Sequence, residues 1–303
     1  MRVTAFLICL GALVWTSCHK SHLQTVVVYT SQDQQFAEPI LKLFTEETGI
    51  EVRAVYDSEG VKTTGLANRL LAESKHPQCD VWWSNEALRT RQLARRGIFD
   101  TNFLATFGFR SRRIVVNTNK LDLASAPSSL VELTNARWRG QVALAYPMFG
   151  TTSAHFIALR QHWGATQWED WCRALAANKP FLVDGNSVVV RLVGRGEALI
   201  GLTDFDDISA GRREGLPVMA LPLNGESLLI PNSVAVVREA RRPANARRLF
   251  DYLQSKRTMK LLVEARALEG ESIDSGSHLS VSWESLLDDL EPATETMRAV
   301  FLR

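Results

Sequence analysis

Short apolar runs alternate with helix-like segments along most of the chain, and this alternation constrains the fold more than any other feature. The run 25–31 (TVVVYTS) is apolar and β-branched at consecutive positions, as in a strand buried on both faces of a parallel sheet. Apolar residues then recur at helical spacing between Asp33, a candidate N-cap, and Gly49, a candidate helix end. The pattern therefore predicts an α/β fold. Further strands are predicted at 50–56, 79–83, 112–118, 141–146, 180–183 and 198–203, with helices at 64–74, 86–96, 152–163, 167–177, 187–193 and 243–255.

Two hydrophobic cores are expected in a chain of 303 residues, because single cores rarely grow beyond roughly 250 to 300 residues. A Pro- and Ser-bearing loop at 124–129 marks a candidate entry into a second lobe. The later strand at 228–237 contains Pro231, which suits a crossing segment better than a central strand. We predict lobe 1 at 24–113 and 237–303, lobe 2 at 121–225, and hinge crossings at 114–120 and 226–236.

The first residues have the pattern of an export signal. Arg2 precedes an uncharged, largely apolar stretch that ends at Ser17 and is shorter than a membrane-spanning helix. The tetrapeptide ending at Cys18 resembles a bacterial lipoprotein box, with Trp15 where Leu is usual. We predict a signal peptide at 1–17, a lipid anchor on Cys18 and a periplasmic location. Ordinary cleavage nearby is the alternative.

Charge and motifs exclude several classes of function. The formal net charge is +2, which is too small to indicate a nucleic-acid or membrane-surface partner. The sequence lacks Gly-x-Ser-x-Gly, P-loop, HExxH and paired-Cys zinc motifs, so we predict that it is not an enzyme. Cys79 and Cys172 fall in different predicted lobes, and we expect buried free thiols rather than a disulfide.

Five segments in a specific order and spacing carry a family resemblance: 26–50, 79–86, 138–159, 184–204 and 230–255. The chain resembles bacterial periplasmic solute-binding proteins of ABC importers, in the extracellular solute-binding family 1, ferric-iron-binding-like group. The resemblance implies a type II periplasmic binding protein fold, with two α/β lobes, a hinge and a central cleft.

The same resemblance implies the function and partners. The chain would be a monomer that closes on its ligand and delivers it to ABC permease and ATPase subunits. The ligand would be ferric iron with an anion, or a small organic anion that bears phosphate or carboxylate. No cofactor is predicted, and bound Fe³⁺ remains an open alternative. A receptor subunit that reports its ligand to a membrane sensor kinase is the competing function.

Polar groups follow several predicted strands, at the ends where ligands bind in open α/β sheets. Helix starts there favour anions through unpaired N–H groups, although plain helix capping is the alternative at each position. The family resemblance implies ligand contacts for the Ser/Thr/Gly turn near 150 and for the Asn near 186. The ligand candidates are Gly150, Thr151, Thr152, Asn186, Ser187 and Arg191 in lobe 2, and Tyr29, Ser31 and Asn85 in lobe 1.

An acidic cluster follows the strand 198–203. Ferric-binding relatives carry adjacent tyrosines here, whereas this chain has Asp204, Asp206 and Asp207. Three roles are open: oxygen ligands of a hard metal ion, polar contacts to an organic ligand, or capping of the next helix. We assign Asp204 to the ligand site, and Asp206 and Asp207 to a metal site. Glu86 joins that metal site because relatives have an acidic ligand at the neighbouring position, Asn85 here.

Overall fold

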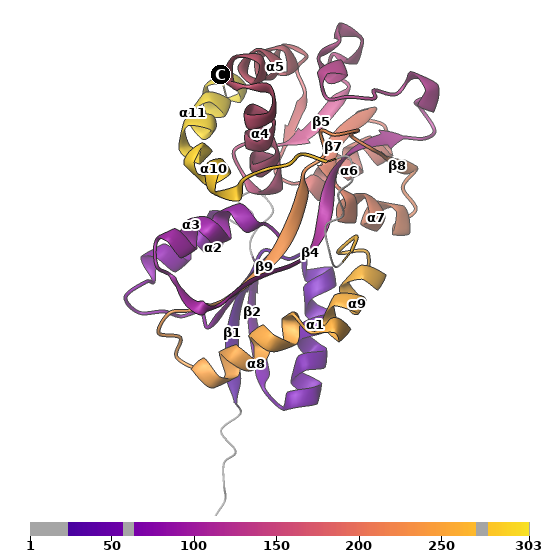
Figure 1. The fold of residues 1–303 in the computed structure, drawn as a ribbon. Helices are drawn as coiled ribbons and strands as arrows, with labels where there is room; N and C mark the ends of the chain where they lie inside the picture. Colours follow the sequence, from indigo (N-terminus) through magenta and orange to yellow (C-terminus); the bar gives the residue numbers. More distant parts are fainter. Residues whose placement is uncertain (1–23, 57–63, 271–277, 303) are drawn as a thin grey trace, which may run out of the picture.

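The computed structural model describes residues 24–56, 64–270 and 278–302 and has two lobes joined by two long strands (Figure 1). The predicted two-lobed α/β fold is confirmed. The predicted signal peptide at 1–17 and the lipidation site Cys18 lie outside the described residues. Among the described helices, none combines the length and the apolar character needed to cross a membrane.

Lobe 1 is built on a mixed sheet with the strand order β2-β1-β3-β9-β4. Strands β1 and β2 are parallel, as are β1 and β3, while β9 runs antiparallel to both β3 and β4. The strands that start this lobe are β1 (Thr25–Thr30), β2 (Glu51–Tyr56) and β3 (Val81–Ser84). Its helices are α1 (Gln34–Thr48), α2 (Thr64–Ala72), α3 (Ala87–Arg95), α8 (Pro243–Leu253) and α9 (Lys256–Glu264).

The hinge consists of β4 (Phe99–Asn117) and β9 (Leu229–Val237), which run from one lobe to the other in Figure 1. Ser111 still pairs with Leu229 in the lobe 1 sheet, whereas Arg112 pairs with Asp204 in the lobe 2 sheet. The first crossing therefore lies earlier than the predicted 114–120, because β4 is one uninterrupted strand that changes partners. Pro231 pairs beside an irregularity in β4, consistent with its missing N–H.

Lobe 2 contains the continuation of β4, followed in sheet order by β7, β5 and β6, while β8 pairs with the other edge of β4. Strand β5 is parallel to both β6 and β7, so the carboxyl ends of these three strands lie at one edge. The strands are β5 (Val142–Ala145), β6 (Phe181–Val183), β7 (Ile200–Asp204) and β8 (Val218–Leu221). The helices are α4 (Gly150–Trp163), α5 (Ala165–Ala177), α6 (Asn186–Arg195) and α7 (Phe205–Arg213), with short 3-10 turns at 123–125, 131–134 and 136–138.

The C-terminal helices α10 (Trp283–Asp288) and α11 (Leu290–Phe301) lie against α4 and α5 of lobe 2 (Figure 1). This differs from the prediction, which placed all of 237–303 in lobe 1. The apolar faces of both helices belong to the lobe 2 core, where the rings of Phe301 and Phe156 are 6.1 Å apart. From this position α10 also contacts α3, and Arg95 pairs with Glu284 and Asp288 across the lobes.

Cys79 and Cys172 are buried as free thiols in different clusters of the core, as predicted. Burial raises the pKa of both thiols.

Candidate functional site between the lobes

A small cavity of about 30 Å³ lies between the lobes, at the carboxyl ends of β5, β6 and β7. Helices α4, α6 and α7 begin directly after these strands, so three helix N-termini meet there. Asn85 of lobe 1 and Arg110 of the hinge complete the wall. The lining residues are Asn85, Arg110, Ala145, Tyr146, Phe149, Gly150, Thr151, Thr152, Asp184, Gly185, Asn186, Asp204 and Asp207. Predicted candidates from both lobes thus meet at one site.

Asp204 is the centre of a buried hydrogen-bonded network in lobe 2. Its carboxylate accepts hydrogen bonds from Thr151 Oγ1 at 2.7 Å and Asn186 Nδ2 at 3.0 Å. Arg112 donates from Nη1 to Asp204 Oδ1 at 2.7 Å and to Asn186 Oδ1 at 3.1 Å. Burial opposes ionisation of Asp204, but the guanidiniums of Arg112 and Arg110 outweigh it and lower the pKa of this carboxyl group. Asp204 is therefore ionised, and its carboxylate is the shared acceptor of the network.

Arg110 links the hinge to the acidic cluster. Its backbone pairs with Ile230 in the lobe 1 sheet, while Nη1 lies 2.6 Å from Asp206 Oδ2 and Nη2 lies 3.2 Å from Asp204 Oδ2 in lobe 2. Burial disfavours the charged guanidinium, yet the pKa of Arg110 is raised because the neighbouring aspartates Asp206 and Asp204 favour the charged form. The side chain is 3% exposed, so this is a buried ion pair between the lobes.

Two of the three carboxylates in the acidic cluster are thus paired with arginine within the protein. One oxygen from each of Asp204, Asp206 and Asp207 lies within 4.8 Å of the others, a grouping that could hold a metal ion. Two guanidiniums, from Arg110 and Arg112, already contact two of these carboxylates. Pairing with arginine was not among the three roles predicted for the cluster.

Lobe 1 contributes a hydroxyl and amide group at the end of β3. Ser31 Oγ donates to Asn85 Oδ1 at 3.1 Å and lies 3.0 Å from Ser84 Oγ. These contacts fix the Asn85 amide so that its Nδ2 is buried at the cavity. Ser31 therefore positions Asn85 and does not itself line the cavity.

Several buried donors around this region lack a partner within the described ranges. They include the Asn85 amide nitrogen, and both Nε and Nη2 of Arg112. Gln32 Nε2 and Arg110 Nε also lack a hydrogen-bond partner there. Buried polar groups are normally hydrogen-bonded, so this concentration of donors indicates a region suited to an acceptor-rich ligand.

Two predicted site residues, Tyr29 and Glu86, have other roles in the structure. Tyr29 packs its ring in the core beneath α2, and its hydroxyl donates to Glu73 at 2.9 Å. Burial and the Glu73 carboxylate raise the pKa of Tyr29. Glu86 caps α3 by accepting from the N–H groups of Leu88 and Arg89, so its carboxylate is used within lobe 1 and not as a metal ligand. Both assignments therefore differ from the predictions.

Ser187 and Arg191 lie one turn apart on α6, and Arg191 Nη2 donates to Ser187 Oγ at 3.2 Å. Neither residue lines the cavity, whereas Asn186 at the start of the same helix does. The helical spacing of the pair explains this contact, because residues four apart share one face.

The predicted site did not include Arg110, Arg112 or Tyr146. A signal for the arginines exists: they are two positions apart in a strand and so share a face, and a buried acidic cluster requires cations. Tyr146 follows β5 directly, at the end of the strand where ligands bind in α/β sheets.

His155 on α4 is fully buried. Its Nε2 lies 2.7 Å from Glu226 O. Burial, aided by the nearby Arg112 charge, lowers the pKa of His155 to about 3, so the ring is neutral at physiological pH.

The two lobes, the hinge strands and the polar cavity at three helix starts define a solute-binding protein. The family model described as bacterial extracellular solute-binding protein matches residues 25–265, and the chain belongs to this family. The narrower family 1 assignment remains a prediction.

Two relatives show how distant the similarity is in sequence. An uncharacterised protein of Haemophilus influenzae is 24% identical over 262 residues, which cover 78% of this chain and 74% of the relative. The major ferric iron-binding protein of Neisseria meningitidis serogroup A is 22% identical, with 81% of this chain and 80% of the relative covered.

Solved structures with different ligands are about equally similar in fold. Iron-bound HitA from Pseudomonas aeruginosa has a TM-score of 0.78 at 19% identity, covering 91% of this chain and 99% of HitA. AfuA from Actinobacillus pleuropneumoniae, with exogenous fructose-6-phosphate bound, has a TM-score of 0.79 at 18% identity, covering 92% of this chain and 99% of AfuA. Fold similarity therefore does not choose between the ligands of these proteins.

Proposed function

We propose that this chain is the periplasmic solute-binding component of an ABC importer and that its solute is a small organic anion bearing phosphate or carboxylate. The observation that carries the choice of ligand is the pairing of Arg110 and Arg112 with the acidic cluster. Binding rather than catalysis is the role, in keeping with the family.

The donor groups at the cavity support an anion. The N-terminus of α4 presents Gly150, Thr151 and Thr152, and Asn85 adds a buried amide N–H from the opposite lobe. Helix N-termini and fixed N–H donors bind phosphate and carboxylate well. Asp184 and Asp207 also line the cavity, where their carboxylates can accept hydrogen bonds from hydroxyl groups of the same solute. A hydroxylated organic anion matches both kinds of group.

Ferric iron with an anion is the second candidate. It is favoured by the close grouping of three carboxylate oxygens and by the iron-binding relatives. Against it, a trivalent cation at this cluster would face the positive charges of Arg110 and Arg112. The tyrosine pair of ferric-binding relatives is absent after β7, and Tyr146 is the tyrosine among the residues that line the cavity.

Calorimetric titration of the chain from Cys18 onward would separate these candidates. The probes are fructose 6-phosphate, citrate, inorganic phosphate, and ferric iron supplied as its nitrilotriacetate complex. We expect an organic anion to bind, and Asn85→Ala to weaken it about tenfold by removing one charge-assisted hydrogen bond. Asn102→Ala, at an exposed position of β4, is the matched control and should leave affinity unchanged.

The opposite result would be binding of iron without binding of an organic anion. Stoichiometric binding of iron that is lost in Asp207→Asn, together with no affinity for any organic probe, would contradict the organic-anion proposal and favour the second candidate.

Transport can be tested separately from ligand identity. The loaded protein should stimulate ATP hydrolysis by its cognate ABC permease and ATPase, reconstituted in proteoliposomes. No stimulation there, with ligand-dependent activation of a neighbouring sensor kinase, would favour the receptor function instead.

A further inference from the structure

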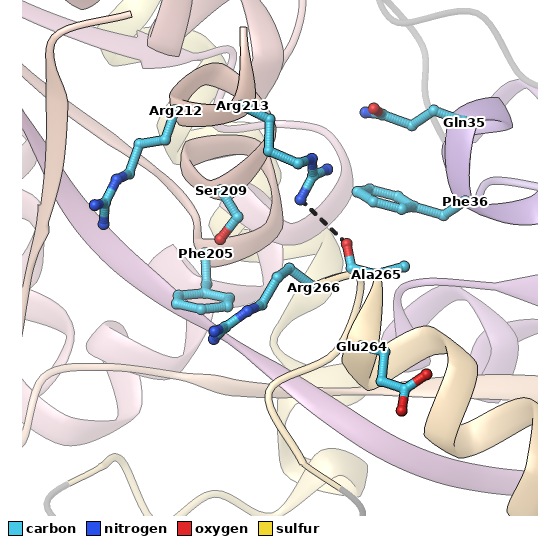
Figure 2. Close-up of a pocket in the computed structure, with 9 residues that line it drawn as sticks. All are labelled: Gln35, Phe36, Phe205, Ser209, Arg212, Arg213, Glu264, Ala265 and Arg266. Atoms are coloured by element: carbon cyan, nitrogen blue, oxygen red, sulfur yellow. Dashed lines mark hydrogen bonds between the residues drawn. The ribbon is translucent and has the colours of Figure 1, made fainter. Parts of the chain in front are cut away.

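A second and much larger hollow lies between the lobes and has no lining residue in common with the small cavity. Its volume is about 630 Å³, within the range of pockets that hold small organic ligands. It is formed by the start of α1 and the end of α9 in lobe 1, and by α7 in lobe 2 (Figure 2). We call it the α7 groove; it is lined by Gln35, Phe36, Phe205, Ser209, Arg212, Arg213, Glu264, Ala265 and Arg266.

The α7 groove is strongly basic. Arg212 and Arg213 reach it from lobe 2 and Arg266 from lobe 1, against the single carboxylate of Glu264 among the lining residues. Figure 2 shows the guanidinium of Arg213 directed at Ala265, whereas those of Arg212 and Arg266 point away from it. Three arginines from the two lobes thus line one groove, and their positive charge favours a bound anion.

Arg213 also ties the lobes together at the groove. Its Nη1 donates to Ala265 O at 3.2 Å, and its guanidinium lies 5.6 Å from the ring centre of Phe36. Both contacts cross from lobe 2 to lobe 1. The walls of the groove are therefore held in their observed arrangement only when the lobes are close together.

Arg266 occupies a backbone conformation that favours glycine. Its φ is 61°, and it follows the last turn of α9, where its N–H donates to Val263 O and the next N–H donates to Leu262 O. This is a helix ending in which Gly is usual because a side chain strains the left-handed conformation. An arginine here costs stability, and its side chain lines the groove, so we interpret the residue as retained for its charge.

Phe205 adds an apolar surface to the groove, whereas the ring of Phe36 is buried. Phe36 is 4% exposed and fixed in the lobe 1 core, and Phe205 at the start of α7 lines the groove from lobe 2. We propose that the α7 groove is a second binding site, for an organic anion with at least two negative charges and a flat ring. Arg212 and Arg266 bind the charges, and the ring of Phe205 contacts the flat ring of the anion.

A ligand in this groove would contact both lobes and so would stabilise the closed arrangement. Any solute at the first cavity that also favours closure would then bind more tightly in its presence, and the effect would be reciprocal. Ligand binding in the α7 groove does not depend on which solute binds in the first cavity.

The test is a titration of the protein with AMP, which has a dianionic phosphate and a flat ring. Binding is monitored by intrinsic tryptophan fluorescence and by calorimetry. Adenosine keeps the ring without charge, and inorganic phosphate keeps charge without the ring. We expect saturable AMP binding that exceeds both. The double variant Arg212→Ala/Arg266→Ala should weaken AMP binding by about tenfold or more, because two charged donors are lost.

Arg139→Ala/Arg241→Ala is the matched control, since it removes two exposed arginines elsewhere and changes net charge equally. It should leave AMP affinity unchanged at the same salt concentration. Failure of AMP to bind saturably up to millimolar concentration would overturn the proposal. An equal loss of AMP affinity in the two double variants would also overturn the proposal, because it would indicate attraction to the overall charge of the protein. Asn85→Ala should not weaken AMP binding directly, which separates this site from the first cavity.

Discussion

Replacement of Arg112 by Met tests the buried network at its most enclosed point. Arg112 is fully buried, and its Nη1 contacts Asp204, Asn186 and Thr151 at 2.7, 3.1 and 3.4 Å. Methionine fills much of the same volume without the charge, so loss of packing contributes little. The variant leaves Asp204 ionised in an apolar interior with Arg110, at 3.2 Å, as its remaining cation.

The expected loss is substantial. Removing one partner of a buried ion pair costs about 3 to 5 kcal/mol, because the other charge is left without compensation. Asp204 retains hydrogen bonds from Thr151 and Asn186, so the lower end of that range applies. Asp204→Asn removes the charge that Arg112→Met leaves unpaired. The double variant Arg112→Met/Asp204→Asn should therefore lose roughly 1 to 3 kcal/mol less free energy of unfolding than the two single variants lose in total.

Urea unfolding followed by tryptophan fluorescence measures this directly, because Trp138 and Trp168 are buried in the core of lobe 2. Arg112→Lys is an informative control: an ammonium group cannot reproduce the fork of the guanidinium, so we expect only partial recovery. Strict additivity of the two single variants, or a wild-type unfolding midpoint for Arg112→Met, would refute the view that this pair is coupled and required.

Three further predictions address other parts of the chain. The pKa of His155 is lowered to about 3 in the folded protein. Below pH 6.5 the unfolded state therefore binds one more proton at this residue than the folded state, and the free energy of unfolding falls as the pH drops toward 3. In His155→Gln, urea unfolding at several pH values should show this slope reduced by about 1.4 kcal/mol per pH unit. Glu269 accepts hydrogen bonds from the N–H, at 2.6 Å, and the hydroxyl of Ser111 where β4 changes partners, so Glu269→Ala should speed hydrogen exchange at that amide. Gly201→Ala should lower stability by about 1 to 3 kcal/mol in thermal unfolding through overpacking, because the added Cβ would lie 2.9 Å from Val115 Cγ1 and in closer conflict with Val189.

Local patterns in the sequence were sufficient for most elements of the fold. The predicted strand at 25–31 matches β1, and Gly49 ends α1 in the left-handed conformation with φ 70°, as expected for a helix stop. These features depend on residues close together in the chain, where apolar periodicity and glycine geometry act directly.

Features that depend on distant partners were missed or misplaced. The amphipathic pattern of 283–301 indicates helices but not which lobe they cover, and that choice is made by packing against Phe156 and its neighbours. The pairing of Arg110 with Asp206 spans 96 positions and that of Arg112 with Asp204 spans 92. With no partner visible locally, Asp204 was assigned to the ligand site, and Asp206 and Asp207 were assigned to a metal site.

The position of Arg110 connects ligand chemistry with lobe closure. Its backbone belongs to the lobe 1 side of β4, while its guanidinium is held by carboxylates of lobe 2. A ligand can drive closure only through contacts that are better in the closed arrangement than in the open one. An anion held at the start of α4 gains Asn85 from the opposite lobe and the charge of Arg110 at the hinge when the lobes close. A cation bound at the aspartates would instead compete with Arg110, and so would weaken the ion pair that joins the lobes.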